Sequence, residues 1–456
     1  MKSFSHIPLT ISAILLITAS SCEKMVEIGL PKNQITTTDV FSDSTNADAA
    51  ILGIYINMMQ AVSLGFCSGG ITAYPGLSAD ELYQSTNDIN LEFHNNTVST
   101  NNSTLLTMWT AAYRYIYETN ACIEGIQNSE TILDHQKSAL VGEAKCIRAF
   151  LYFYLVNMFG PVPLVLNTDY QSNRLLYRIS EDEIYSQIIA DLISAQTSLI
   201  NRPEDNTRVG YYTATALLSR IYLYNHDFNE AKDQATIVIN SGRYNLMSDL
   251  NDIFTTSSKE TIWGLLPVYP NRETWEGYYF IPSSTTATPR FIISEHLYNA
   301  IDPIDKRKQS WINTTEIADQ VYPYPYKYKK SSTTSNPTEQ YVVLRLSEQY
   351  LIRSEAEANL GEIEDAQNDL NSIRARAGLP NIQNVDGNEL LIAIEKERQI
   401  ELMCEWGHRW FDLKRTGRAT GILPPLKENW KETALLFPIP QSEINNNPNL
   451  TQNPSY

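Results

Sequence analysis

Three glutamates near the C-terminal end of the chain recur at every fourth position: Glu397, Glu401 and Glu405. On an α-helix this spacing places the three carboxylates along one face. Paired carboxylates are the groups that glycoside hydrolysis requires, and retaining enzymes hold them roughly 5 Å apart. Three like charges on one face also repel one another unless cations neutralise them. The row therefore suits either a hydrolytic site or a set of ion pairs.

The surrounding arginines favour ion pairs. Arg409 follows Glu405 by four residues, which is the favourable order for a pair on a helix. Arg353 and Arg374 could approach from other helices. We therefore predict a structural role for the row and no catalytic residue in it. The predicted ion-pair cluster consists of Glu397, Arg398, Glu401, Glu405 and Arg409.

Other motifs give no sign of metal, phosphate or nucleophilic chemistry. The histidines lack HExxH or similar ligand spacing, and no glycine-rich phosphate loop is present. A GxSxG segment is also missing, although a Ser/His/Asp triad built from distant segments stays open. We expect no metal and no cofactor. The histidines beyond residue 22 are scattered along the chain: His94, His135, His226, His296 and His408.

Two aromatic segments are better candidates for a binding site. Sugars bind to flat aromatic faces through their C–H surfaces and need amide, carboxylate or guanidinium groups for their hydroxyls. The segment from Tyr74 to Tyr83 also contains Asp80, and a polar run with Asn87, Asp88, Asn90 and Asn95 follows it. The alternative is that Asp80 and Tyr83 only fix this loop against the scaffold.

The second aromatic segment contains Trp275, Tyr278 and Tyr279, with Arg290 and Trp311 further along the chain. Loops on a rigid scaffold are where binding sites tend to lie. The run from Tyr322 to Tyr328 could face a ligand, face a partner or pack inside. The predicted ligand-binding residues are Tyr74, Asp80, Tyr83, Trp275, Tyr278, Tyr279, Arg290 and Trp311.

The N-terminal segment resembles an export signal. Lys2 precedes an apolar run from Ile7 to Ala19, two serines follow, and Cys22 comes next. Such a segment is too short to span a bilayer as a stable helix. We predict a lipoprotein signal peptide over 1–21, acylation (palmitate and related chains) of Cys22 and an extended tether over 22–45. The alternative is an ordinary secretion signal with an incidental cysteine.

The net charge limits the classes of partner, and the cysteine spacing limits the disulfides that the chain could form. The formal net charge is −17, which argues against nucleic acid, because nucleic-acid binding depends on basic surface. We expect membrane attachment through the lipid. Four cysteines remain, none in a CxxC pair, and buried free thiols are expected; one disulfide, for example Cys122–Cys146, stays possible. The four are Cys67, Cys122, Cys146 and Cys404.

Helical periodicity dominates the rest of the chain. The pattern predicts a first helix from about Asn46, helices over about 104–127 and 136–159, and a capping box at Ser180–Glu183. Residues 65–102 read as loop. Two helix pairs, over about 213–239 and 350–378, each have an alanine after the turn, as tetratricopeptide repeats do.

These patterns predict a mostly α fold. We expect a tetratricopeptide-like helix-pair scaffold and an irregular, aromatic-rich loop region in one domain over 46–456. Its parts are a helical part over about 46–242, a loop-rich region over about 243–340 and a second helical part over about 341–456.

Three blocks of sequence resemble a known family. The first consists of residues 142–153 and the following stretch Asn157-Met-Phe-Gly-Pro-Val-Pro163. The second covers 341–356 and 370–378. The third holds Glu405-Trp-Gly-His-Arg-Trp-Phe-Asp-Leu-Lys-Arg415, then 437–441 and 447–453. Together they resemble the SusD/RagB family of Bacteroidota outer-membrane lipoproteins; Trp406 departs from the common pattern and should alter packing only.

The resemblance implies a nutrient-uptake role. SusD-like proteins carry a tetratricopeptide-like scaffold, bind ligand on irregular loops and sit at the cell surface over a SusC-like TonB-dependent transporter. They capture oligosaccharide, or peptide in the RagB branch, and are not enzymes. The implied function is thus surface capture of nutrient oligosaccharide for transport. RagB-type peptide import is the alternative, and a helical-repeat scaffold on the periplasmic side is a third.

Overall fold

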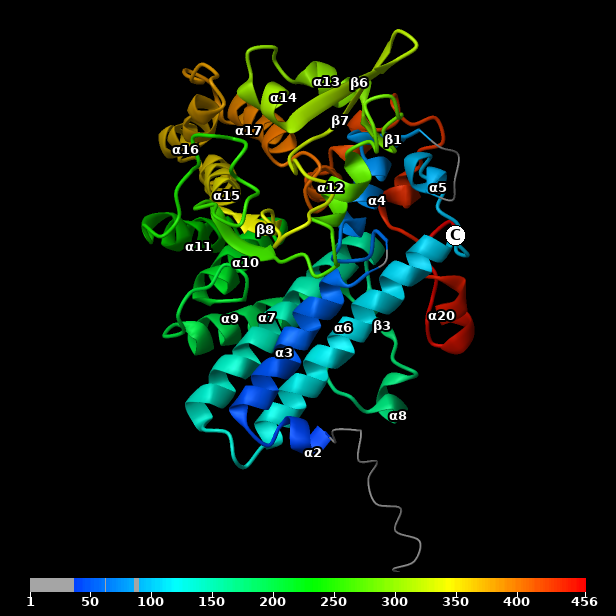
Figure 1. The fold of residues 1–456 in the computed structure, drawn as a ribbon, viewed down its shortest axis with the longest axis vertical. Coiled ribbons are helices and arrows are strands. Elements are labelled where there is room, and N and C mark those ends of the chain that lie inside the picture. The colour runs from blue at the N-terminus through cyan, green and yellow to red at the C-terminus, as the bar shows by residue number, and fades with distance from the viewer. Residues whose placement is uncertain (1–36, 62, 86–89) are drawn as a thin grey trace, which may run out of the picture.

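The computed structural model describes residues 37–61, 63–85 and 90–456 (Figure 1). The predicted signal peptide, Cys22 and most of the predicted tether lie outside the described residues, as do Asn87 and Asp88. No helix within the described ranges is both long enough and apolar enough to cross a membrane.

Long helices form the N-terminal part of the scaffold, and α3, α6 and α7 run side by side in Figure 1. Asn102 caps α6 by accepting a hydrogen bond from the Leu105 amide, and the predicted Ser180–Glu183 capping box opens α9. Gly160, at φ 70°, ends α7. The predicted helices are confirmed to within two residues. Their bounds are α3 Ser44–Met59, α6 Ser103–Asn128, α7 Asp134–Phe159 and α9 Glu181–Leu199.

The predicted helix pairs are confirmed, and the four helices pack against one another in sequence. Ala231 and Ala366, the alanines after the two turns, are fully buried where the helices approach closely. Gly361 makes the second turn at φ 81°. The pairs are α10 Tyr211–Tyr224 with α11 Phe228–Asn240, and α15 Leu346–Leu360 with α16 Ile363–Arg376. Helices α17 Gly387–Glu401 and α18 His408–Arg415 follow.

Short strands form four two-stranded antiparallel sheets among the described residues. Strand β1 Leu82–Gln84 pairs with β5 Phe291–Ile293, and β4 Thr261–Leu265 pairs with β8 Tyr341–Arg345. Strand β6 Ile312–Ile317 pairs with β7 Gln320–Pro325, which contains the start of the tyrosine-proline run. The fourth sheet is β2 Val162–Pro163 with β3 Arg178–Ile179. Further short helices are α2 Thr37–Val40, α8 Tyr170–Asn173, α12 Trp275–Phe280, α13 Glu295–Ala300, α14 Lys306–Trp311, α19 Ala419–Ile422 and α20 Gln441–Asn446.

Two expectations about loops are wrong. Residues 65–102 contain α4 Gly70–Ser78, β1 and α5 Leu91–His94. Helix α4 is entirely buried, so its small residues reflect close packing: a Cβ on Gly70 would lie 2.5 Å from the Gly65 carbonyl oxygen. The end of the predicted tether is helical as well. Helix α2 lies within it, and α3 begins at Ser44, where the Asp43 side chain caps the helix.

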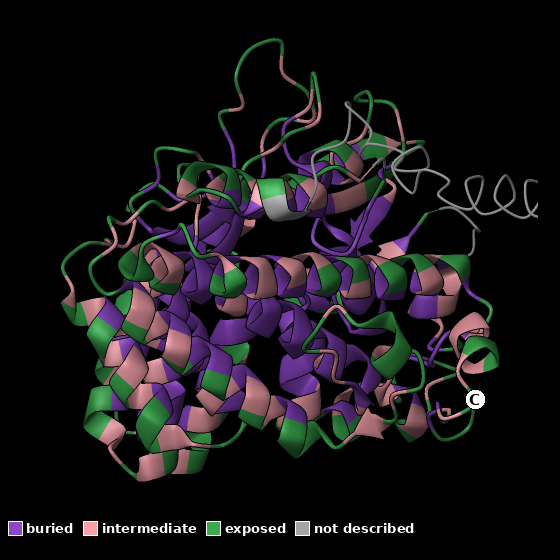
Figure 2. Cartoon of the chain, turned by 90° about the horizontal axis from the view of Figure 1, so that it is seen from below, coloured by how far each residue is buried: buried purple, intermediate pink, exposed green. Residues whose placement is uncertain are grey.

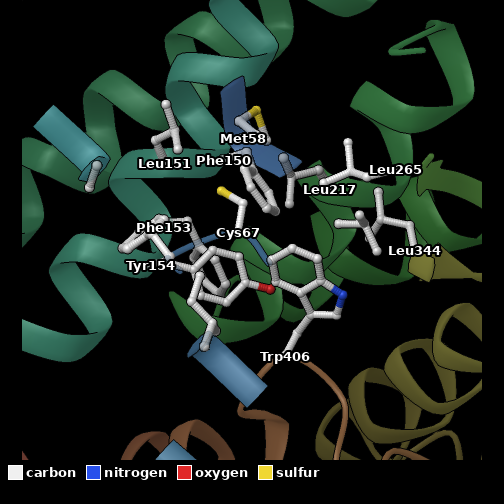
Figure 3. Packing of buried hydrophobic residues seen from close by; sticks show 14 of the residues in the cluster. Met58, Cys67, Phe150, Leu151, Phe153, Tyr154, Leu217, Leu265, Leu344 and Trp406 are labelled. Carbon is white, nitrogen blue, oxygen red and sulfur yellow. The ribbon is translucent and has the colours of Figure 1, made fainter. Parts of the chain in front are cut away.

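A continuous apolar core joins the helical and the loop-rich parts (Figures 2 and 3). Phe150 of α7 contacts the rings of Trp263 and Trp406, at 5.0 Å and 5.4 Å between centroids. Trp406 also stacks on Tyr341 of β8 at 4.5 Å. Cys67 lies in the same core, and all four described cysteines are free and buried, as expected. The loop-rich part therefore has a rigid base.

Candidate ligand-binding surface

The row of glutamates is buried and held by cations from several elements. Glu401 ends α17 and Glu405 lies beyond it, so the expected single helical face does not include Glu405. Arg307 contacts Glu397 at 2.6 Å and Glu401 at 2.9 Å. Arg345 contacts Glu401 at 2.5 Å and Glu405 at 2.7 Å. Arg374, Arg376 and Lys327 complete the set of contacts.

The two arginines of the predicted cluster pair differently from the expectation. Arg409 binds Asp80 at 2.8 Å and contacts Glu395 at 3.4 Å, and it has no ion pair with Glu405. Arg398 binds Asp412 at 2.9 Å. The break in the helix after Glu401 changes the direction of the chain, which removes the four-residue relation that the sequence suggested.

Electrostatics around these carboxylates oppose acid catalysis. Burial alone would raise the pKa of Glu401, but Arg376, Arg345 and Arg307 hold it well below its usual value. Burial opposes ionisation of Glu405 too, and Arg345 and Lys327 nevertheless lower its pKa. A glycosidase acid needs a raised pKa, so this cluster suits a structural role.

Four of the eight predicted ligand-binding residues are buried. Trp311 has no exposed surface, and its indole N–H donates to the Leu250 carbonyl at 3.0 Å. Tyr74 stacks on Phe93 at 4.9 Å, inside the core. Asp80 accepts hydrogen bonds from Arg409, and Trp275 is 3% exposed. These side chains position their neighbours and present little surface of their own to a ligand.

Helix α12 presents the exposed aromatic side chains. The Thr274 hydroxyl caps it by accepting from the Gly277 amide at 3.0 Å. Glu273 accepts from the amides of Thr338 and Glu339, and Glu276 accepts from the Tyr341 hydroxyl at 3.1 Å. A Cβ on Gly277 would lie 2.2 Å from the Lys330 carbonyl oxygen, so glycine allows this close approach. The helix is thereby fixed between α4 and β8 (Figure 1).

Four rings and one guanidinium form what we call the α12 surface: Tyr269, Arg272, Trp275, Tyr278 and Tyr279. Trp275 stacks under Tyr279 at 5.7 Å with 27° between the rings. Tyr278 is 40% exposed and meets Tyr279 edge to face at 5.1 Å. Arg272 lies 3.7 Å from the centre of the Tyr278 ring and 4.4 Å from that of Trp275. Sequence reasoning missed Tyr269 and Arg272, although Arg272 precedes Trp275 by three residues.

Strand β5 links the α12 surface to a cavity beside the β1–β5 ladder. Arg290, just before β5, lies 5.1 Å from the centre of the Tyr279 ring, and its carbonyl accepts from the Ser85 amide at 3.2 Å. On the neighbouring strand, Tyr83 pairs with Ile292. Tyr83 is half-buried and lines a cavity of about 670 Å³ beside this ladder. Predicted residues from both aromatic segments therefore meet at one small sheet.

Polar groups surround this cavity. His296 approaches the Asp80 carboxylate at 3.3 Å, and the Lys427 ammonium lies 3.1 Å from His94 Nδ1. Burial lowers the pKa of Lys427 to about 7. Burial, with Lys427 nearby, lowers the pKa of His94 to about 4. The cavity therefore offers hydrogen-bond donors and acceptors, and His94 carries no charge near neutral pH.

No group of three or more histidine, cysteine, aspartate or glutamate side chains in the described part of the chain could hold a metal ion.

The α12 surface and the cavity contain aromatic faces and hydrogen-bonding groups. Such an arrangement can bind a polyhydroxylated or aromatic ligand.

Comparisons with known proteins agree over most of the chain. A family model described as "SusD family" matches residues 268–456, and one described as "Starch-binding associating with outer membrane" matches residues 46–223. The chain is 27% identical to SusD-like protein P2 of Formosa agariphila over 97% of this chain and 98% of that protein. It is 34% identical to the starch-binding protein SusD of Bacteroides thetaiotaomicron over 144 residues, 29% of this chain and 24% of that protein.

Solved structures share the fold. A SusD superfamily protein from Bacteroides vulgatus aligns with a TM-score of 0.81 and 22% identity, covering 91% of this chain and all of that one. A second B. vulgatus structure aligns with a TM-score of 0.79 and 25% identity over the same shares. A mostly helical scaffold, two matching family models and relatives along the whole chain lead to one assignment: the chain belongs to the SusD family.

Proposed function

We propose that this chain is a cell-surface, outer-membrane lipoprotein that binds nutrient oligosaccharide and delivers it to a SusC-like TonB-dependent transporter. The observation that carries the proposal is the α12 surface, where Tyr278 and Tyr279 lie at the surface over a buried Trp275. Rings fixed in this way lose little freedom when a sugar ring packs on them.

The binding role rests on chemistry at the α12 surface and the adjoining cavity. Tyr278 and Tyr279 supply aromatic faces, and Arg272 and Arg290 supply donors for hydroxyl groups. Tyr83 continues this set of side chains toward the cavity. The starch-binding relative and the family description support a saccharide as the ligand class.

Binding without cleavage is part of the proposal. The pKa values of Glu401 and Glu405 are lowered, where a glycosidase acid needs a raised one. The protein would capture the ligand and close over the transporter, and no bond would be broken. Incubation of the purified chain with any glycan that it binds should give no shorter product.

The ligand class can be tested with arrays of oligosaccharides and peptides, probed with the purified full chain in detergent. Binding to oligosaccharides supports the proposal. Binding to peptides alone would favour RagB-type import. Binding to neither would refute a nutrient-capture role for this surface.

The anchor can be tested separately with Cys22→Ala. Several acyl chains on one residue hold a domain on a membrane, since each buried methylene contributes about 0.8 kcal/mol. We expect the variant to leave the membrane fraction while it binds glycan with wild-type affinity. Protease added to intact cells should digest the wild-type protein. Protection of the wild type would instead indicate a periplasmic location.

A further inference from the structure

Arg272 is held in an unusual way for an arginine of this chain. Its guanidinium lies over three rings, at 3.7 Å from the centre of Tyr278, 4.4 Å from Trp275 and 5.1 Å from Tyr269. Contacts with three rings from one short segment restrict the side chain to a single position. The cation is therefore ordered before any ligand arrives.

No hydrogen bond or ion pair joins the Arg272 side chain to any other described residue. The two nearest acids in sequence are turned away: Glu273 accepts backbone amides of the 338–339 segment, and Glu276 accepts from the buried Tyr341 hydroxyl. By contrast, Arg220 and Arg345 are each matched by carboxylates at 2.6–2.8 Å. Arg272 therefore carries a positive charge that no carboxylate of the described residues neutralises.

Stacking on a ring leaves the donors of a guanidinium available. The N–H groups lie in the guanidinium plane, whereas the ring contacts its face. The planar fork matches the geometry of a carboxylate or of sulfate oxygens, and bonds to such anions are roughly twice as strong as neutral ones.

We propose that the saccharide recognised at the α12 surface carries an anionic substituent, a uronate carboxylate or a sulfate ester, which Arg272 binds while a sugar ring packs on Tyr278 and Tyr279. The inference rests on the proposed function, since it assumes that this surface binds a saccharide. It adds the chemical class of that saccharide.

The experiment is a glycan array containing uronic-acid, sulfated and neutral oligosaccharides, probed with the purified full chain. We expect the strongest signals from anionic glycans, with either uronates or sulfated sugars identifying the source of the charge. Signals confined to neutral glycans would overturn the anionic assignment and leave the proposed function standing. An array without any signal would overturn both.

Titration calorimetry then tests Arg272 itself, with the strongest array hit and the same glycan after carboxyl reduction or desulfation. Arg272→Gln should weaken binding of the anionic form about tenfold and leave the neutral form nearly unchanged. Added salt should weaken wild-type binding more than it weakens the variant. Equal losses for both forms would show that Arg272 only supports the rings, and would overturn the proposal.

A matched control uses another arginine stacked on a tyrosine. Arg243 lies 5.8 Å from the centre of the Tyr212 ring, away from α12. Arg243→Gln should bind both forms of the glycan as the wild type does. A loss of anionic binding in this control equal to that of Arg272→Gln would point to the overall charge and would overturn the assignment to Arg272.

Discussion

The arginines of the buried ion-pair cluster and Arg272 of the α12 surface are stabilised by different partners. Arg345 is almost fully buried and contacts Glu260, Glu401 and Glu405. Arg272 is only half-buried and contacts rings instead. A buried charge is tolerated only with partners, because desolvation costs several kcal/mol per ion. A charge at the surface keeps part of its hydration and needs no acid.

This difference in partners distinguishes the arginines that stabilise the scaffold from the arginine that is proposed to bind ligand. In the cluster, carboxylates and guanidinium groups neutralise one another, so no charge is left for a ligand. At the α12 surface, the rings fix the cation and leave its donors available. Identical side chains thus stabilise the fold in one region and suit recognition in the other, according to burial and partners.

The largest effect is expected from breaking the buried cluster. Glu401→Gln removes the charge that faces Arg345, Arg376 and Arg307. We expect the free energy of unfolding to fall by about 3–5 kcal/mol, because the cations stay buried without full compensation. Urea unfolding of the full chain measures this loss.

Arg418→Gln is the matched control for this variant. Arg418 pairs with Glu395 at 3.0 Å, but its side chain is 52% exposed. Exposed pairs contribute less than about 1 kcal/mol, so unfolding should change little. Equal losses in the two variants would contradict the contrast between buried and exposed pairs.

A smaller effect is expected from Glu81, a buried carboxyl whose pKa burial raises in spite of the charges of Arg409 and Lys327. Burial raises the pKa of Glu81 from 4.5 to about 8, although its side chain accepts from the Cys404 amide at 3.0 Å. Between these two values the folded state holds a proton that the unfolded state releases, so this group makes stability fall as pH rises. We expect Glu81→Gln to remove a slope on the order of 1 kcal/mol per pH unit.

Thermal or urea unfolding of wild type and Glu81→Gln between pH about 5 and about 8 measures that slope. The gain of the variant over the wild type should grow with pH. Glu316→Gln, an exposed residue of β6, is the control and should follow the wild-type profile. Parallel profiles for Glu81→Gln and wild type would show that Glu81 ionises normally.

The smallest effect on the fold, and a clear effect on binding, is expected at the α12 surface. Tyr278→Ala removes a 40% exposed ring, so stability should stay within about 0.5 kcal/mol. Affinity for the glycan should fall about two- to tenfold, since an aromatic contact contributes about 0.5–1.5 kcal/mol. Calorimetry with the array hit measures this loss.

Tyr170→Ala is the control, because Tyr170 on α8 is 71% exposed and lies outside the proposed surface. It should leave both stability and affinity unchanged. Unaltered affinity in Tyr278→Ala, together with Trp275→Ala, would show that the ligand binds elsewhere.

Much of the scaffold was predictable from the sequence. The helices around 104–127 and 136–159 and both helix pairs have strong periodicity and clear ends, such as Gly160 and the Ser180–Glu183 box. Helix α4 was not predictable, because its glycines and small residues resemble a loop until neighbouring backbone packs against them. Local patterns carry no information about such close approaches.

The binding residues were predictable only in part. Residue type pointed to aromatic segments, and Tyr278, Tyr279, Arg290 and Tyr83 do lie at or near the surface. Type could not separate them from Trp311 and Tyr74, whose rings are buried. An amphipathic ring suits either environment, so exposure depends on which elements cover it.

The sequence by itself determined the helical scaffold, the balance of charge and the resemblance to a family, because these depend on local periodicity and residue type. Only the tertiary structure decided which charges are neutralised. Arg409 pairs with Asp80, 329 residues away, and Arg272 pairs with no carboxylate among the described residues. Charge pairing depends on distance in space, and that distance is set by the packing of segments remote in sequence.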